Sequence, residues 1–316
     1  MSRIYEALQK AESERKLERH ERDLRTPVEQ LDPVPSPAAV ADYEAPAPFA
    51  DPRVETIDEM AASRPFAGGL NLSAVPRHTW SPSVERLPAL LERGPAIEQF
   101  RSLRSRIYEA RDIRPIKSIL VSSGLPQEGK SFISTNLAIS LARHKNSKVL
   151  LIDGDMRRYT VHEMLGTVSH PGLADYLAGK ATPEEIMQRA EDAADPQASG
   201  LSVLQNLAFI PGGNGGDKAA DLSGSARFGE LLRTAAPHFD WIIIDSSPVL
   251  PVSDAVNLAR SCDGVLLVAR SGITKYPVAQ RAASELRASN ILGFVLNAVH
   301  EAPQVGNYYG YNANKE

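Results

Sequence analysis

A chain of 316 residues with 42% hydrophobic and 6% aromatic residues can bury one good-sized core, but need not do so along its whole length. The formal charge of -4 gives no overall drive toward nucleic acid or anionic lipid, so non-specific DNA binding is disfavoured. One cysteine, Cys262, excludes a disulfide framework and suits a reducing compartment, which predicts a cytoplasmic location. No apolar run approaches the ~18 residues of a membrane span and no signal-peptide core is present, so membrane association is expected only through a partner.

Residues 1–25 have the charge pattern of an exposed helix. Ser2 is a suitable N-cap, and acidic residues repeatedly stand four positions before basic ones, which stabilises a solvated helix. Ile4, Leu8 and Ala11 form a short apolar stripe on it. The segment is either a docking helix for a partner or neighbouring subunit, or a helix stabilised by its own charges.

Prolines are dense between residues 26 and 93. Proline has no backbone N–H, so such a segment sustains neither helix nor ladder hydrogen bonding, and it has no periodic apolar residues. We expect a semi-extended linker that is disordered in isolation. A plain spacer and a Pro-rich recognition segment both fit this composition.

Regular structure resumes at Gly94-Pro95, where proline suits the first turn of a helix. From Ile97 to Ala110 the apolar residues recur at helical spacing and form one stripe. The opposite face carries three charged residues at spacing three, Glu98, Arg101 and Arg104. That charged face is either a solvated surface or an interaction surface.

Short apolar segments then alternate with helical patterns. Continuous β-branched runs such as Trp241–Ile244 are typical of a parallel sheet covered on both faces. The sequence predicts a doubly wound α/β domain over residues 94–300, with its ligands beyond the carboxyl ends of the strands. The predicted strands are Ile116–Ser122, Lys148–Asp153, Leu201–Ile210, Trp241–Asp245, Gly264–Ala269 and Ile291–Val299. The predicted helices are Lys130–His144, Pro171–Gly179, Pro183–Ala190, Ser225–Ala236, Ser253–Arg260 and Lys275–Ser289.

The segment Gly124–Ser131 matches G-x-x-x-x-G-K-[ST], a phosphate-binding loop, between the first predicted strand and a predicted helix. Gly124 and Gly129 allow the backbone N–H groups to curl toward phosphate oxygens. Lys130 supplies a positive charge for the β- and γ-phosphates, Ser131 a hydroxyl for Mg²⁺, and the helix N-terminus a partial positive charge. The sequence therefore predicts a nucleotide site.

Aspartates follow two predicted strands at their carboxyl ends. Asp153 and Asp155 end one strand and Asp245 ends another. Mg²⁺ in phosphoryl transfer is held by one or two carboxylates with phosphate oxygens and water, and Asp245 is the candidate. Asp153 is the candidate for orienting or deprotonating the nucleophile. The alternative for each is an aspartate that caps a turn or helix.

Two other groups of residues extend this site. Arg157 and Arg158 follow Asp155 and either stabilise transferred charge, hold an acidic substrate or lie on the surface. The tail at residues 301–316 carries three tyrosines within four positions, Tyr308, Tyr309 and Tyr311. A tail with clustered phenol groups is suited to phosphorylation, and the alternative is an aromatic tail that packs on a neighbour.

Together these motifs resemble the bacterial tyrosine kinases of capsule and exopolysaccharide export, of the CpsD and CapB type, over about residues 94–311. Gly124–Ser131 resembles the family's Walker A motif, Leu150–Arg158 its Walker A′ motif, and Trp241–Asp254 its Walker B segment. The resemblance implies a P-loop NTPase fold with deviant Walker motifs. It also implies transfer of the γ-phosphoryl group of ATP to C-terminal tyrosines of neighbouring subunits.

The resemblance implies ATP and Mg²⁺ as cofactors and assigns residues to them. The implied catalytic residues are Lys130, Asp153, Asp155 and Arg157. The implied nucleotide-binding residues are Gly124, Gln127, Glu128, Gly129, Lys130, Ser131, Phe132 and Asn297, and the implied metal ligands are Ser131 and Asp245.

The resemblance also implies partners. Glu98, Arg101 and Arg104 match a Glu-x-x-Arg-x-x-Arg helix that helps the family assemble a homo-oligomeric ring, and the tail tyrosines match its autophosphorylated cluster. The family's cytoplasmic kinases depend on a transmembrane activator of the chain-length-determinant type. This implies a cytoplasmic protein that reaches the inner membrane through that partner and regulates polymer assembly and export.

Some positions differ from the family pattern, and two other functions compete. Tyr159 stands where proline is common, and Ser246-Ser247 replaces the commoner Thr-Pro or Ser-Pro. A ParA/MinD-type positioning ATPase would carry a lysine where this chain has Leu125. An ATP-binding scaffold of the export machinery without catalysis would use the same nucleotide ligands as a kinase.

Overall fold

The computed structural model of the chain describes residues 69–144, 147–191 and 201–299. The expected N-terminal helix at 1–25, the first part of the expected linker and the tyrosine-bearing tail at 301–316 lie outside the described residues.

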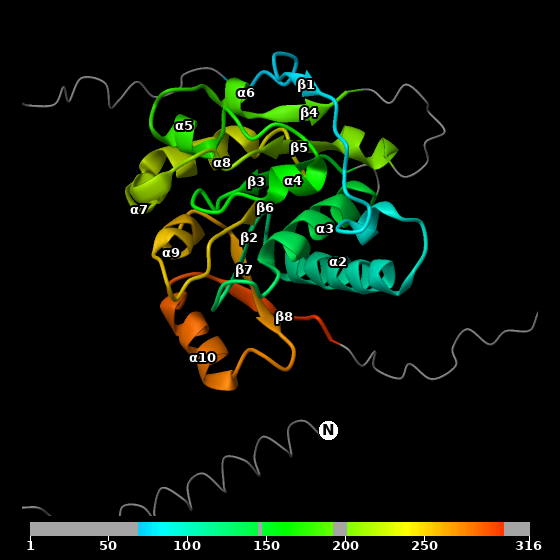
Figure 1. Cartoon of the computed structure of the whole chain (residues 1–316), viewed down its shortest axis with the longest axis vertical. Helices are drawn as coiled ribbons and strands as arrows, with labels where there is room; N and C mark the ends of the chain where they lie inside the picture. The colour runs from blue at the N-terminus through cyan, green and yellow to red at the C-terminus, as the bar shows by residue number, and fades with distance from the viewer. Residues whose placement is uncertain (1–68, 145–146, 192–200, 300–316) are drawn as a thin grey trace, which may run out of the picture. The chain divides into compact units, whose positions relative to one another are not determined.

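An eight-stranded sheet forms the centre of the described domain, in the order β1-β4-β5-β3-β6-β2-β7-β8 (Figure 1). Neighbouring strands are parallel except for the β4 and β5 pair. The strands are β1 (Arg77–His78), β2 (Ser118–Ser123), β3 (Val149–Asp153), β4 (Gln188–Ala190), β5 (Leu207–Ile210), β6 (Trp241–Asp245), β7 (Gly264–Arg270) and β8 (Ile291–Asn297). Every residue of β2, β3 and β6 is buried, as their continuous apolar sequences predict.

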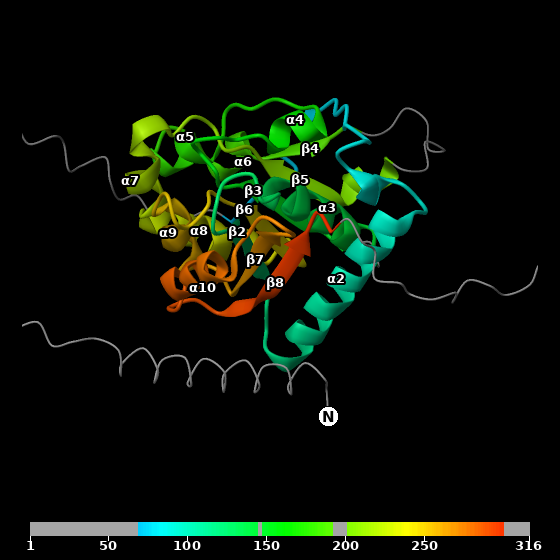
Figure 2. The ribbon, with the colours of Figure 1, turned by 60° about the horizontal axis from the view of Figure 1, so that its bottom comes forward.

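Helices cover both faces of this sheet, which confirms the doubly wound α/β prediction (Figures 1 and 2). One face packs against α2 (Pro95–Ile113), α3 (Lys130–Ala142) and α4 (Val161–Leu165) around a core that includes Leu137 and Ile243. The other face has its own core. Its helices are α5 (Leu173–Leu177), α6 (Pro183–Ile186), α7 (Ala219–Ser223), α8 (Ala226–Ala235), α9 (Asp254–Ala259) and α10 (Tyr276–Glu285). Three 3₁₀ turns, η2 (Pro88–Leu90), η3 (Ser202–Asn206) and η4 (Gly216–Lys218), complete the described elements.

Two predicted elements are divided in the structure. The helix expected over Pro183–Ala190 ends after one turn, and Gln188–Ala190 forms β4 instead, paired with β5 on one side and β1 on the other. Tertiary pairing there overrides the local helical pattern, because a strand gains ladder hydrogen bonds that a short helix end lacks. The strand expected over Leu201–Ile210 likewise begins only at Leu207, after η3.

Residues 69–93 differ from the expected disordered linker, because they pack on the domain. Leu87 is fully buried and Trp80 contacts Phe209 edge to face. Asn136 on α3 accepts a hydrogen bond from the backbone N–H of Ala89 at 3.0 Å. Pro88 occupies the first turn of η2, where no backbone N–H is needed, so proline is compatible with this order.

The described helices include none with both the length and the apolar composition needed to cross a bilayer.

Replacing Leu87 with alanine tests the packing of this segment. The change leaves a cavity under η2, and we expect the free energy of unfolding to fall by about 2–5 kcal/mol in urea denaturation. Leu91→Ala is the matched control, because Leu91 is 45% exposed and should change stability by about 0.5 kcal/mol or less. Equal effects of the two substitutions would contradict the packed segment.

Candidate active site

The phosphate-binding loop lies between β2 and α3, at the carboxyl edge of the sheet, where the sequence predicts it. Gly129 is the N-cap of α3 with a φ of 97°, and Gln127 also has a positive φ, 63°. These left-handed positions turn the chain so that α3 begins at Lys130. No described side chain caps the N-terminus of α3, so its first backbone N–H groups are available to an anion.

Buried polar contacts hold this loop in place. Glu128 is 2% exposed; its Oε2 accepts a hydrogen bond from Leu125 N at 2.8 Å, and its Oε1 accepts one from the Thr274 hydroxyl. Asn297 Nδ2 donates to the backbone oxygen of Glu128 at 2.9 Å, and Arg270 donates to that of Gln127 at 3.2 Å. The Glu128 carboxylate and the Asn297 amide thus hold the loop in position. This structural role is additional to the nucleotide-binding role that the resemblance implies for both residues.

The first turn of α3 presents one charged side chain at the site. Lys130 is 7% exposed, and no hydrogen bond or ion pair joins its ammonium to another described residue. Phe132 lies on a different side of this turn, where its ring contacts Phe100 of α2 with centroids 5.8 Å apart. The Phe132 side chain therefore packs between the two helices.

Asp153 and Asp245 end the neighbouring strands β3 and β6 and are direct partners in the register of the sheet. Asp153 is fully buried; its Oδ1 accepts a hydrogen bond from Asp155 N at 3.1 Å and its Oδ2 from Val161 N at 3.2 Å. Burial, and next the charge of Asp245, raise the pKa of Asp153 well above its ordinary value. Asp153 therefore binds a proton more readily than an exposed aspartate does.

Asp245 has the environment of a cation ligand. Burial raises its pKa to about 6, while the nearby Ser131 hydroxyl and Lys130 ammonium oppose that rise. No described group forms a well-aligned hydrogen bond with either of its carboxylate oxygens, and the buried Ser247 hydroxyl is also unpartnered among those residues. Buried, unpartnered oxygens are costly, so these atoms are suited to a bound cation.

The donor set fits Mg²⁺ held jointly with phosphate. Mg²⁺ usually takes one or two protein oxygens and fills its other positions with phosphate oxygens and water. Within the described ranges no three acidic, histidine or cysteine side chains form a complete metal cage. The hydroxyl of Ser131 and the carboxylate of Asp245 are the residues that would hold the ion.

The arginines after Asp155 have different surroundings. Arg157 Nε donates to Asp254 Oδ2 at 2.7 Å and its Nη2 donates to Oδ1 at 3.3 Å, and Asp254 itself is 1% exposed. The hydrogen bond with Asp254 also raises the pKa of Arg157. This bidentate pair fixes the Arg157 guanidinium beside α9. Arg158 is exposed, and it contacts the site only through its backbone N–H, which donates to Asp155 Oδ1 at 3.0 Å.

The charged face predicted on α2 is only partly a free surface. Glu98 and Arg101 form an ion pair with each other, and both side chains stay about half exposed, at 50% and 41%. Arg104 differs, because its Nη1 donates to Ser140 O on α3 at 2.9 Å and burial lowers its pKa. Arg104 therefore helps to join the two helices.

Three residues at the site were not assigned a role from the sequence: Thr274, Arg270 and Asp254. Thr274 and Arg270 reach the phosphate loop because β7 lies beside β2 in the sheet, although about 145 positions separate them in sequence. Their place at or just after the end of a predicted strand was the available signal. Asp254 had a weaker signal, as an acidic residue at a helix start.

Gly129 provides a test of the loop geometry. A Cβ at this position would lie 2.0 Å from Asn297 Nδ2, and the φ of +97° is strained for any other residue. We expect Gly129→Ala to weaken Mg-ATP binding by about tenfold or more in isothermal titration calorimetry. Gly69→Ala is the control, because nothing lies within 4 Å of its added Cβ. Unchanged affinity in the Gly129 variant would show that the loop does not contact the nucleotide.

The comparisons with known proteins agree with this geometry, although no family model matches the chain. The chain is 34% identical over 220 residues to the tyrosine-protein kinase Wzc of Salmonella typhimurium. The aligned region covers 68% of this chain but only 28% of that protein. It is 33% identical over 221 residues to the tyrosine-protein kinase YwqD of Bacillus subtilis, covering 69% of this chain and 87% of that protein.

Two solved structures support the same relationship. The kinase domain of the Escherichia coli tyrosine kinase ETK superposes with a TM-score of 0.62 at 29% identity, covering 75% of this chain and 88% of that domain. The chimerical protein CapA2B2 superposes with a TM-score of 0.60 at 27% identity, covering 70% of this chain and 93% of that one. The chain therefore belongs to the family of bacterial tyrosine-protein kinases.

Proposed function

We propose that this protein is an ATP-dependent protein-tyrosine kinase that phosphorylates tyrosines of its own chain. The observation that carries the proposal is the arrangement at one edge of the sheet. The phosphate loop with buried Lys130 lies at the end of β2, next to β6, and the paired carboxylates of Asp153 and Asp245 lie at the ends of β3 and β6. In this proposal the anion-binding groups, the metal-ligand candidate and the proton acceptor act together at that edge of the sheet.

In this proposal the loop and its cation site position the triphosphate. The backbone N–H groups of the loop and the Lys130 ammonium would bind the β- and γ-phosphates, and Ser131 and Asp245 would hold Mg²⁺. When bound, Mg²⁺ supplies positive charge that offsets the charge developing on the transferred group.

Asp153 would act as the proton acceptor. A free tyrosine has a pKa of about 10 and is almost entirely protonated at neutral pH, so a base is needed. The tyrosine oxygen bonds to the γ-phosphorus while the bond from that phosphorus to the β–γ bridging oxygen breaks. The phenol proton passes to Asp153, and ADP leaves with the bridging oxygen.

Asp155 and Arg157 have supporting roles in this scheme. The Asp155 backbone N–H donates to Asp153 and its carboxylate accepts from Arg158 N, so this residue fixes the turn that carries the base. The Asp254 carboxylate holds Arg157 with its guanidinium partly exposed. The exposed part of the Arg157 guanidinium would stabilise the transferred charge while the ion pair with Asp254 stays in place.

The acceptor and the partners extend the proposal beyond the described residues. Tyr308, Tyr309 and Tyr311 of a neighbouring subunit would be the acceptors, in a homo-oligomeric ring. A transmembrane activator of the chain-length-determinant type would bring this cytoplasmic protein to the membrane, where it regulates exopolysaccharide or capsule assembly and export. The names of the relatives as tyrosine-protein kinases support the kinase activity on which these further proposals rest.

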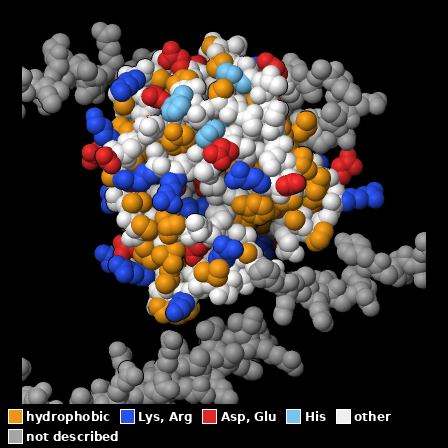
Figure 3. Space-filling view, viewed as in Figure 1, with side chains coloured by type: hydrophobic (Ala, Val, Ile, Leu, Met, Phe, Trp, Pro, Cys, Tyr) orange, Lys and Arg blue, Asp and Glu red, His pale blue; other side chains and the backbone are white. Residues whose placement is uncertain are grey.

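Nucleic acid is not among the proposed partners. The face shown in Figure 3 mixes positive and negative side chains, without a continuous basic surface. The formal charge of the chain, -4, agrees with that distribution.

Phosphotyrosine mapping tests the reaction. The purified full chain is incubated with Mg-ATP and the cytoplasmic fragment of its activator, and modified peptides are identified by mass spectrometry. We expect phosphate on Tyr308, Tyr309 or Tyr311, and a loss of about 100-fold or more in its rate of formation in Lys130→Met, because the charge that holds the β- and γ-phosphates is removed.

The same experiment separates the competing functions. ATP binding without any phosphotyrosine would favour a non-catalytic scaffold. Release of inorganic phosphate from ATP without phosphotyrosine would favour a positioning ATPase of the ParA/MinD type. Label that persists in Lys130→Met would point to a contaminating kinase.

The ring proposal has a separate test on α2. Arg101→Glu reverses an exposed charge and should cost the isolated fold only about 0.5 kcal/mol, since the Glu98 pair is solvent-exposed. We expect sedimentation velocity to show loss of the ring in this variant. Arg106→Glu, at an exposed position of the same helix, should still assemble. A monomeric wild-type chain, or equal assembly of both variants, would contradict the ring interface.

A further inference from the structure

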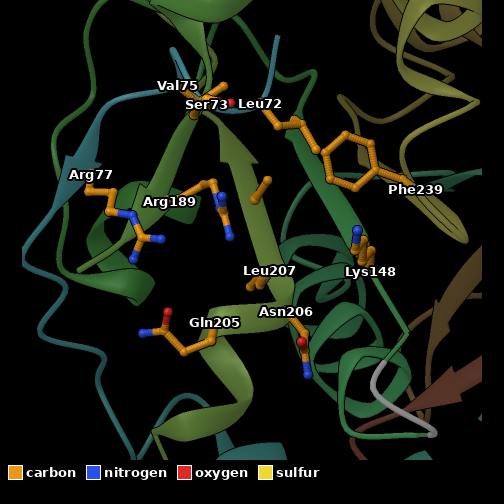
Figure 4. Close-up of a pocket in the computed structure, with 11 residues that line it drawn as sticks. Leu72, Ser73, Val75, Arg77, Lys148, Arg189, Gln205, Asn206, Leu207 and Phe239 are labelled. Carbon is orange, nitrogen blue, oxygen red and sulfur yellow. The ribbon is translucent and has the colours of Figure 1, made fainter. Parts of the chain in front are cut away.

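A cavity lies at the end of the sheet opposite the phosphate loop. It has a volume of about 580 Å³ and is lined by residues of β1, β4 and β5, the residue before β3 and the loop after α8. Figure 4 shows the labelled side chains around it. Small-molecule sites in proteins commonly measure about 300–1,000 Å³, so the cavity is large enough for one small organic ligand.

The register of the sheet places the charged side chains of this cavity on one face. Arg77 of β1 pairs with Arg189 of β4, and Arg189 pairs with Ala208 of β5. Ala208 pairs in turn with Leu150 of β3, and Lys148 lies two positions before Leu150. Side chains two apart on a strand share a face, so the three cationic side chains point into the same layer.

The charge of this lining is entirely positive. Three of its residues, Arg77, Lys148 and Arg189, are cationic, and none is acidic. Within the described ranges, neither the Arg189 guanidinium nor the Lys148 ammonium has an ion-pair or hydrogen-bond partner.

The nearby acids are occupied elsewhere. Asp240 Oδ2 accepts a hydrogen bond from the Lys148 backbone N–H at 2.8 Å, and Glu191 Oε2 accepts one from the Thr79 hydroxyl at 2.6 Å. Neither acid lines the cavity. The Arg189 and Lys148 side chains therefore leave two positive charges at the cavity that can attract an anion.

Most of the other residues of the cavity wall are apolar, and Ser73, Gln205 and Asn206 are polar but uncharged. Val75, Leu207 and Phe239 are buried residues that also belong to the cores of the domain, and Leu72 packs against one of those cores. Apolar walls with a few convergent charges are typical of sites that bind an organic molecule rather than a free inorganic ion.

We propose that this cavity binds a small phosphorylated organic molecule, with the phosphate between Arg189 and Lys148 and an apolar or planar group against Leu72, Val75 and Phe239. Arginine is suited to phosphate because its planar fork makes two parallel hydrogen bonds, and lysine adds a point charge. A hollow of this size accepts one such molecule, whereas an acidic peptide would need an extended groove.

The proposed site is separate from the nucleotide site. Lys148 precedes the first residue of β3, and Asp153 ends that strand. Five residues of strand span about 16 Å, so the phosphate loop and this cavity lie at opposite ends of the sheet. The two sites can therefore be filled and tested independently.

Calorimetry with phenyl phosphate tests the site, because this probe combines a doubly charged phosphate with a planar apolar ring. The full chain is first saturated with Mg-ADP to fill the nucleotide site. We expect phenyl phosphate to bind with a Kd below about 1 mM and phenol, which lacks the charge, to bind at least about tenfold more weakly.

Matched variants locate the binding. The double variant Lys148→Gln, Arg189→Gln should weaken phenyl phosphate binding by about tenfold or more, since it removes two charge-assisted contacts. Arg287→Gln removes an exposed arginine elsewhere on the domain and should leave the affinity unchanged. If the double variant fails to fold, Lys148→Gln alone serves, because Lys148 is an exposed residue.

Three outcomes would overturn the proposal. The first is the absence of phenyl phosphate binding to the ADP-saturated wild type at about 10 mM probe. The second is equal affinity in the wild type and the double variant. The third is binding of a hexaglutamate peptide, dependent on Lys148 and Arg189, in place of phenyl phosphate, which would assign the cavity to a protein partner.

Discussion

The buried carboxylate of Glu128 is the contact on which the nucleotide site depends. A buried carboxylate is unfavourable unless it is hydrogen-bonded, and its two oxygens bind the Leu125 N–H inside the loop and the Thr274 hydroxyl after β7. The loop is therefore fixed to the neighbouring strand rather than only to its own flanking elements. Asn297, at the end of β8, adds a second link through the Glu128 backbone oxygen. The phosphate-binding backbone is held ready before any ligand arrives, which lowers the entropic cost of binding.

The aspartates on the other side of the site are arranged at an energetic cost, because both carboxylates are buried close together. Asp153 and Asp245 end adjacent strands in direct register, and burial raises the pKa of each. The charge of Asp245 adds to the rise at Asp153, and the charge of Asp155 adds to the rise at Asp245. Such a pair is stabilised when positive charge enters between the loop and the strands. Under the proposed function, a rigid phosphate side and buried carboxylates opposite it would favour the metal complex of a nucleotide over the nucleotide alone.

Because most neighbouring strands are parallel, the two ends of the sheet carry different side chains: acidic ones at the carboxyl ends of β3 and β6 and basic ones near the cavity. β3 ends in Asp153 at the nucleotide site and begins next to Lys148 at the basic cavity. Residues 69–93 contribute to this separation, because β1 and the loop before it form a wall of that cavity. The packed part of the expected linker thus builds a surface of the domain. Its prolines, such as Pro88 in the first turn of η2, lie where a backbone N–H is not required.

The sequence alone determined the doubly wound fold, the phosphate loop and the aspartates at the strand ends, because strand burial, glycine conformation and strand-end chemistry are local properties. The tertiary structure decided which strands are neighbours, and therefore that Thr274 and Arg270 contact the loop and that Asp254 fixes Arg157. It also placed Phe132 between helices, joined Arg104 to α3 and made a strand of Gln188–Ala190. These features depend on contacts between residues that are distant in sequence, and a local pattern carries no information about them.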